Sequence, residues 1–183
     1  EIGSTSQDGP DATHFETDGY SGTLTLNDFL NMEVRDHIPS AKVVVNQNAR
    51  LEFGHRDVES LFTTRAGEVT VNSGGTLGGS GTINGSVSIA SGGTLLAGST
   101  NNLGTLTLAN GLSFTDSGST NTVRVTGANG AQTNGVVVTG GTVALADAAL
   151  VIDDTGLTGE VPLPLTIIVT AAESEPSLPS LMV

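Results

Sequence analysis

Four acidic side chains near the amino terminus could hold a metal ion. They lie within eleven residues of one another and are Asp8, Asp11, Glu16 and Asp18. Carboxylate oxygens are the ligands that calcium prefers, so calcium is the one cofactor that the sequence suggests. The spacing matches neither an EF-hand loop nor the nonapeptide Gly-Gly-x-Gly-x-Asp repeat. A solvated acidic loop is therefore the simpler interpretation of these residues.

The remaining ionisable groups are poorly arranged for catalysis. Asp36-His37 and His55-Arg56-Asp57 are adjacent in sequence, but neighbouring residues of a strand point to opposite faces. The single lysine, Lys42, has no acidic cluster around it in sequence. Two carboxylates about 5–10 Å apart, as a glycosidase needs, could still be brought together by stacked strands. We therefore expect no enzyme and keep a glycan-binding or glycan-cleaving protein as the alternative.

The overall charge limits the partners of the chain. The 183 residues carry a formal net charge of −13, which repels the phosphates of nucleic acids and anionic membrane surfaces. No apolar run approaches the roughly 18–20 residues of a membrane-spanning helix, so we expect no membrane insertion. The sequence starts at Glu1, without an initiator Met or the layout of a signal peptide. We expect a processed chain or a piece of a longer one.

A repeat in the middle of the sequence predicts how the elements are arranged. The segment VTVNSGGTL at 69–77 returns as VSIASGGTL at 87–95, an offset of 18 residues, within a stretch (69–115) that holds no charged residue. Such a unit is too small to bury its own apolar face and must stack on its neighbours. The pattern predicts an all-β fold, a β-solenoid of parallel strands.

The same short strand pattern, in which apolar residues alternate with others, recurs along the chain. It begins at Leu24, Val43, Val69, Val87, Leu106 and Val123, with gaps of 19, 26, 18, 19 and 17 residues. Between the strands, glycine pairs and Asn-Gly steps predict sharp corners with positive φ. These corners are Gly74-Gly75, Gly78-Gly79, Asn84-Gly85, Gly92-Gly93 and Asn110-Gly111.

Two segments carry their own expectations. Strand alternation in 50–53 (RLEF) places Leu51 and Phe53 inside and a solvated Arg50–Glu52 pair outside. The segment 28–37 (DFLNMEVRDH) predicts instead a helical turn, which the proline at position 39 would end.

Three regions follow from these patterns. Residues 1–22 are polar, contain Asp-Gly turns and lack a period, which predicts an irregular cap or loop. Residues 23–172 carry the strand pattern of the solenoid. Residues 173–183 hold two prolines and predict an extended tail.

The repeat region also resembles a known family. The segments Gly74–Gly85 (GGTLGGSGTING), Val87–Gly98 (VSIASGGTLLAG) and Leu103–Leu108 (LGTLTL) resemble the β-helical passenger stalk of bacterial autotransporters and the related strand repeats of large secreted surface proteins. The likeness covers about residues 65–172 and includes the later segments Val138–Leu145 and Leu165–Thr170. Ala97 stands where the family commonly has proline.

The resemblance implies a right-handed parallel β-helix, an extracellular or bacterial cell-surface location, and a structural or adhesive role without catalytic residues. We therefore expect a stalk or adhesin segment, or a surface building block that associates with itself or with other cell-surface proteins. The open ends of such a fold can pair through main-chain hydrogen bonds. The apolar segment near the carboxyl terminus is the candidate joint, through Leu163, Leu165, Ile167 and Val169.

Overall fold

The computed structural model describes residues 22–28, 31–34, 42–53, 63–64, 67–98, 102–128, 132–159 and 168–170. All regular structure in these ranges is β, and they contain no helix. It follows that the described part has no helix able to cross a membrane.

The strands form three sheets. Sheet A contains, in spatial order, β1 (Thr23–Leu26), β3 (Lys42–Val45), β6 (Glu68–Val71), β9 (Ser86–Ile89), β12 (Leu112–Phe114) and β16 (Val143–Ala144). Sheet B contains β2 (Asn31–Val34), β4 (Arg50–Phe53), β7 (Thr76–Gly79), β10 (Thr94–Ala97) and β13 (Thr120–Ala128), with β14 (Gln132–Thr133) and β17 (Ala149–Thr158) both paired to β13. Sheet C contains β5 (Thr63–Thr64), β8 (Thr82–Ile83), β11 (Thr105–Leu108), β15 (Gly135–Val138) and β18 (Ile168–Thr170).

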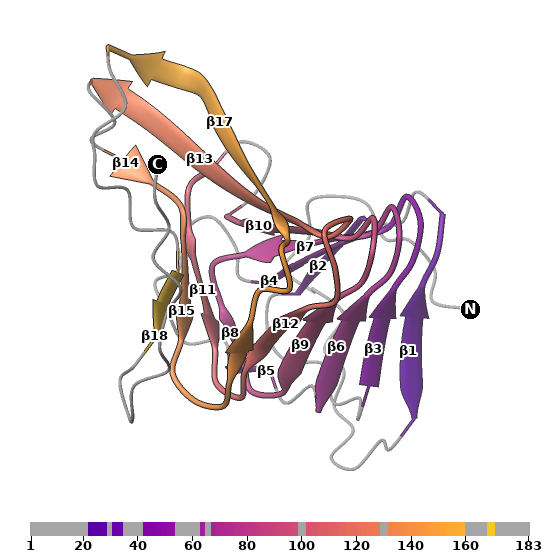
Figure 1. The fold of residues 1–183 in the computed structure, drawn as a ribbon. Coiled ribbons are helices and arrows are strands. Elements are labelled where there is room, and N and C mark those ends of the chain that lie inside the picture. Colours follow the sequence, from indigo (N-terminus) through magenta and orange to yellow (C-terminus); the bar gives the residue numbers. More distant parts are fainter. Residues whose placement is uncertain are drawn as a thin grey trace, which may run out of the picture.

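The chain visits the sheets in a fixed order. From β3 onward it passes from sheet A to sheet B to sheet C and back to sheet A, and we call each such set of strands a circuit. Strands of successive circuits lie side by side, as the row from β1 to β12 in Figure 1 illustrates. Their pairings are parallel, and among the described pairs of strands only β13 with β14 is antiparallel. The prediction of an all-β fold with stacked parallel strands is confirmed.

The 18-residue repeat is one circuit. Val69 pairs with Val87 in sheet A, and Leu77 pairs with Leu95 in sheet B, so residues 18 apart occupy equivalent places. Strand alternation sends these side chains inward, where each is at most 1 % exposed. The interior is thus a set of stacked columns formed mainly by Val, Leu and Ile.

The strand pattern alone does not identify the sheet. Val87 is followed in its column by Leu112, whereas Leu106 lies in sheet C and Val123 in sheet B. The regular series from Val87 to Leu106 to Val123 therefore does not mark successive turns of one sheet. All three sheets use the same alternation of apolar and polar residues, so the pattern cannot distinguish them.

The corner between sheets A and B repeats with the same backbone geometry. In each of three circuits the third residue of the turn has a positive φ: 60° at Asn48, 74° at Gly74 and 75° at Gly92. The amide of Asn48 donates to the carbonyl oxygen of Gly74, and the amide of Gly74 donates to that of Gly92. Because the left-handed conformation favours glycine and asparagine, these residues explain where the chain turns.

An asparagine ladder runs along the start of the same corner. Nδ2 of Asn46 donates to Oδ1 of Asn27 at 2.7 Å, and Nδ2 of Asn72 donates to Oδ1 of Asn46 at 2.7 Å. Ala90 occupies the next place, since its amide bonds to Val71 just as the amide of Asn72 bonds to Val45. The ladder therefore ends at Asn72, because the next circuit has Ala90 in the equivalent place.

Three local expectations are corrected. The helical turn predicted for 28–37 is wrong, because 31–34 form β2, which pairs along its length with β4 and so gains hydrogen bonds from tertiary structure. The Asn84-Gly85 step has no positive φ, whereas Gly74, Gly79, Gly92 and Gly111 do. The Arg50–Glu52 pair forms, but its side chains are only 19 % and 20 % exposed rather than fully solvated.

Candidate assembly surface at one end of the stack

Most residues singled out for chemistry lie outside the described ranges. This applies to the candidate calcium ligands Asp8, Asp11, Glu16 and Asp18, and to Leu163, Leu165 and Ile167 of the candidate joint. Val169 is the one joint residue whose backbone is described, within β18, where it pairs with Val137. Lys42 is also described, and its Nζ lies 3.2 Å from Oε1 of Glu68 on the neighbouring strand of sheet A.

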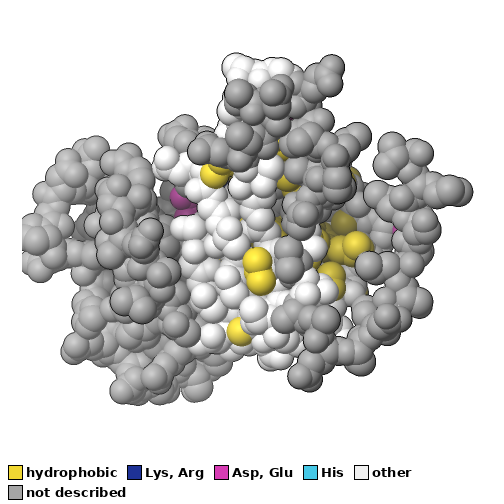
Figure 2. Space-filling view, turned by 90° about the vertical axis from the view of Figure 1, so that its left-hand side faces the viewer, with side chains coloured by type: hydrophobic (Ala, Val, Ile, Leu, Met, Phe, Trp, Pro, Cys, Tyr) yellow, Lys and Arg dark blue, Asp and Glu magenta, His cyan; other side chains and the backbone are white. Residues whose placement is uncertain are grey.

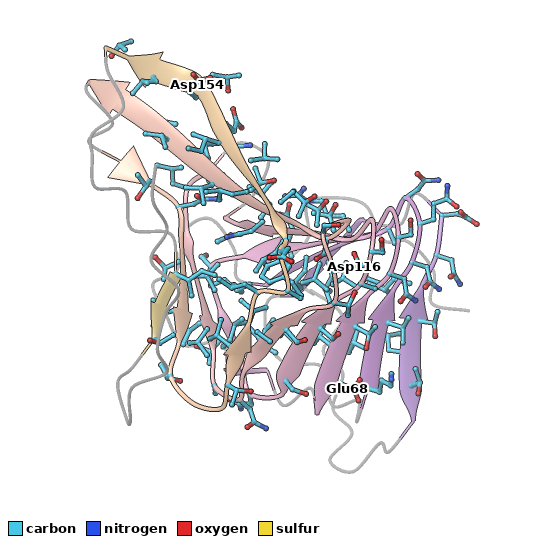
Figure 3. The ribbon with its side chains drawn as sticks, viewed as in Figure 1. Glu68, Asp116 and Asp154 are labelled. Atoms are coloured by element: carbon cyan, nitrogen blue, oxygen red, sulfur yellow. The ribbon has the colours of Figure 1, made fainter. Side chains whose placement is uncertain are left out.

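Three of the described acids lie on separate elements. Figure 3 labels Glu68 in sheet A, Asp116 in the turn after β12, and Asp154 on β17, and the three are well separated in that view. Asp116 accepts a hydrogen bond of 2.8 Å from the amide of Gly118 within its own turn. No group of three or more metal-binding side chains occurs among the described residues.

The exposed apolar side chains, by contrast, gather at one place. The exposed large hydrophobic residues of the described ranges are Leu145, Leu150, Val151 and Ile152, at 47 %, 43 %, 44 % and 45 %. They lie within eight consecutive residues, in or next to the last circuit, β16–β17–β18. Figure 2 looks at the side of the molecule on which β13, β15 and β17 lie in Figure 1, and it shows apolar patches among mostly uncharged atoms.

Two of these residues continue interior columns. Leu150 pairs with Asn121, which pairs in turn with the fully buried Leu95, and Ile152 pairs with the buried Val123. Inward positions of earlier circuits are covered by the next circuit. At β17 the column ends among the described strands, so its apolar side chains meet solvent.

The opposite end of the stack differs. β1 is the outermost described strand of sheet A at that end, and its inward residue Leu26 is only 1 % exposed. Leu145, which follows β16 at the other edge of the same sheet, is 47 % exposed. The two edges of sheet A are therefore not equivalent, because the apolar residue is buried at the β1 edge and exposed at the β16 edge.

β13 and β17 also extend past the stack. β10 pairs with β13 only at Thr120 and Asn121, whereas β17 pairs with β13 from Thr120 to Ala128. Figure 1 shows these two long strands projecting together beyond the other circuits. The register between them shifts after Arg124, so β17 carries an irregularity at Asp153 to Gly156. Bulges of this kind interrupt further pairing along an edge.

An ion pair joins the two long strands just before the register shift. Nε of Arg124 lies 2.8 Å from Oδ2 of Asp153, and the Oγ1 of Thr155 donates to Oδ1 of Asp153 at 2.6 Å. The hydrogen bond from Thr155, followed by that from Arg124, lowers the pKa of Asp153 from 3.8 to about 2. This carboxylate is therefore ionised at neutral pH and its charge is balanced within the molecule.

Two buried asparagines lie beneath this end and differ in their hydrogen bonds. Asn134, 2 % exposed, donates from Nδ2 to the carbonyl of Ala97 at 2.7 Å and accepts at Oδ1 from the amide of Arg124 at 2.7 Å. Asn121, 6 % exposed, has no hydrogen-bond partner for its Oδ1. The side-chain amide of Asn134 therefore uses both its donor and its acceptor, whereas the Oδ1 of Asn121 accepts no hydrogen bond.

The sequence did not identify this surface. Leu150, Val151 and Ile152 form an apolar run like those of the partly buried strands β3 and β15, so only their position in the last described circuit distinguishes them. Comparisons with known proteins add nothing further, because no family model, no curated protein and no solved structure matches this chain.

Proposed function

We propose that this protein is a right-handed parallel β-solenoid with a structural role outside the cell or on the bacterial cell surface. In this role it serves as a stalk or adhesin segment, or as a building block that associates with itself or with other surface proteins. The observation that carries the proposal is the fixed order of sheets A, B and C through successive circuits, with residues 18 apart in register.

Two further observations support a structural role. The polar outer positions of the middle circuits are mainly serine and threonine, as at Thr70 and Ser88 in sheet A, so circuits stack without repulsion between like charges. The resemblance of residues 65–172 to the autotransporter stalk supports the location and the handedness. A protein of this kind acts through its length and its surfaces rather than through a cavity.

Glycan cleavage has less support. It needs two carboxylates about 5–10 Å apart on one face, and the three acids labelled in Figure 3 come from well-separated elements. Sugar-binding surfaces also rely on aromatic side chains, and the chain has one tyrosine and no tryptophan.

Duplicating one circuit tests the proposal directly. A second copy of residues 69–86 inserted after position 86 should add one circuit, because Val69 and Val87 occupy equivalent places. Small-angle X-ray scattering should then show the same cross-section and a particle longer by about 4.8 Å. Stability should hold or rise, since stacked repeats gain from each additional neighbour.

A matched control inserts the same residues in scrambled order at the same position, which should destabilise the protein. If the duplicated variant unfolds, or if its cross-section grows instead of its length, the proposal of a solenoid is refuted. Electron microscopy and sedimentation of the original chain, with and without calcium, then report whether it works as a monomeric segment or as an assembling unit.

A further inference from the structure

We propose that two copies of this chain associate end to end through the β16–β17–β18 circuit, with β17 of one copy antiparallel to β17 of the other about a two-fold axis. The inference rests on the proposed solenoid and specifies how it associates. The product is a closed pair rather than a filament.

The surface that drives this association is the uncovered apolar row. Leu145, Leu150, Val151 and Ile152 are each 43 % to 47 % exposed, and they account for the exposed large hydrophobic residues of the described ranges. β17 also pairs with β13 along one edge only, and no described strand pairs with its other edge. Free main-chain groups beside exposed apolar side chains form a surface for strand addition.

The difference in apolar exposure between the two ends favours a two-fold pair over a head-to-tail filament. A filament needs head-to-tail contacts, in which the uncovered row of one copy meets an uncovered row at the β1 end of the next. Among the side chains described at that end, Leu26 in β1 is only 1 % exposed, so sheet A offers no such row there. A two-fold axis instead brings the exposed ends of two copies together and uses the same surface twice.

The two-fold arrangement also suits the order of strands within the circuit. β16, β17 and β18 lie in sheets A, B and C, with β17 between the other two along the chain. A two-fold axis through the β17 pair, perpendicular to the stack, places β16 of each copy against β18 of the other. Both strands then run antiparallel to their new neighbours, so one axis serves all three sheets.

The charged and apolar residues of β17 together select the register of the pair. If Val151 of each copy lies on the axis, Asp153 faces Ala149 and Asp154 faces Ala148 of the other copy. The Asp147 side chains then face Thr155. No carboxylate lies directly opposite another in this register.

Neighbouring registers place like charges opposite each other or apolar residues opposite carboxylates. An axis at Leu150 puts Asp147 opposite Asp153, and an axis between Asp153 and Asp154 pairs those two residues. An axis at Ile152 puts Val151 opposite Asp153 and Leu150 opposite Asp154, whereas an axis at Val151 puts Leu150 opposite Ile152. Like charges directly opposite across a strand pair are destabilising. The Arg124–Asp153 ion pair and the register shift that follows it further limit pairing to the first half of β17.

A single cysteine tests the contact and the register together. The chain has no cysteine, so Val151→Cys introduces the only thiol. Residues facing each other in an antiparallel pair have Cα atoms about 4.5–5.5 Å apart, which a disulfide can bridge. Mild oxidation should convert most of this variant to a covalent dimer, with Ala149→Cys and the distant, exposed Thr25→Cys as controls that remain mostly uncrosslinked.

Sedimentation equilibrium and small-angle scattering test the association without any covalent bond. The unmodified chain should form a dimer about twice as long as the monomer and with the same cross-section. Ile152→Asp should weaken dimerisation about 100-fold or more, because it buries unpaired charge, whereas Thr25→Asp should not change it. Circular dichroism and urea unfolding verify that each variant remains folded.

Three results would overturn the inference: a monomer at every concentration, growth into filaments, or a dimer that Val151→Cys does not crosslink. A monomer that still lengthens when residues 69–86 are duplicated would refute the end-to-end pair and leave the solenoid in place. A duplication variant that unfolds would refute both.

Discussion

Asn72 donates a hydrogen bond from its Nδ2 to Oδ1 of Asn46 at 2.7 Å, although 26 residues separate them in sequence. Asn46 in turn donates a hydrogen bond from its own Nδ2 to Oδ1 of Asn27. Asn46 thus donates to one neighbouring circuit and accepts from the other. The middle member of this ladder is therefore the one whose loss breaks two bonds.

Replacement of Asn46 with alanine should lower the free energy of unfolding by about 1–2 kcal/mol, because it removes both side-chain hydrogen bonds. Urea denaturation followed by circular dichroism measures the change. Asn110→Ala, at an exposed position, is the matched control and should change stability by less than about 0.5 kcal/mol. Equal effects of the two variants would contradict a role for the ladder.

Extending the ladder should stabilise the protein. Ala90 occupies the place after Asn72 at the same corner, and its amide makes the equivalent backbone hydrogen bond. Ala90→Asn should add one side-chain bond to Asn72 and raise the free energy of unfolding by about 0.5–1 kcal/mol. The same unfolding experiment tests this, and a loss of stability would show that the third circuit does not align with the second.

Substitution of a corner glycine should lower the stability through backbone strain rather than through a lost hydrogen bond. Gly92 has φ 75°, and a Cβ built there would lie 2.4 Å from Oγ of Ser73. Gly92→Ala should cost about 1–2 kcal/mol for the left-handed backbone, besides the displacement of Ser73. Asn48→Gly, at the equivalent place with φ 60°, should be tolerated, and a thermal unfolding series compares the two.

Asn121 and Asn134 should respond in opposite directions to the same substitution. Asn121→Leu completes the column of Leu95 and Leu150 and removes an unpartnered buried oxygen, so it should stabilise the protein by about 1–3 kcal/mol. Asn134→Leu leaves the carbonyl of Ala97 and the amide of Arg124 without their side-chain partner and should destabilise it by about 3 kcal/mol. If Asn121→Leu destabilises instead, its carbonyl oxygen has a partner in solution.

The low pKa of Asp153 predicts that the stability of the protein decreases at acidic pH. Its pKa is about 2 in the folded protein and near 3.8 ordinarily, so the folded state holds the proton less tightly. The contribution to stability is present above about pH 4 and is lost as the pH falls toward 2. The side chain is 22 % exposed, so we expect less than about 1 kcal/mol from the pair. The free energy of unfolding, measured at pH 2, 3, 4 and 6, should fall toward low pH. Asp153→Asn should remove the part of this fall that comes from the ionisation of Asp153.

Much of the fold could be predicted from the sequence, because strand alternation and the 18-residue repeat are local properties. Alternation placed Leu51 inside, and the structure confirms this position, since its side chain is 0 % exposed. The pattern failed where pairing with distant strands decides the structure. The strand at 31–34 depends on β4, and the place of Leu106 in sheet C depends on its pairing with Val136.

The assembly surface could not have been predicted in the same way. Leu150 and Ile152 alternate along their strand as buried residues do, and only the absence of a further described circuit beyond them exposes their side chains. The sequence directed attention instead to Leu163, Leu165, Ile167 and Val169, which remain a prediction. Exposure at an end is a property of the stack and not of the residues themselves.

The stacking of circuits also determines how the protein should bear mechanical load. Among the described strands β18 pairs only with β15, so a force applied at Thr170 along the stack acts on one strand and its few hydrogen bonds at a time. The chain should peel off circuit by circuit, at low and repeating force. The projecting β13–β17 pair is loaded differently by a pull along its strands, because its long register shares the force among many hydrogen bonds at once.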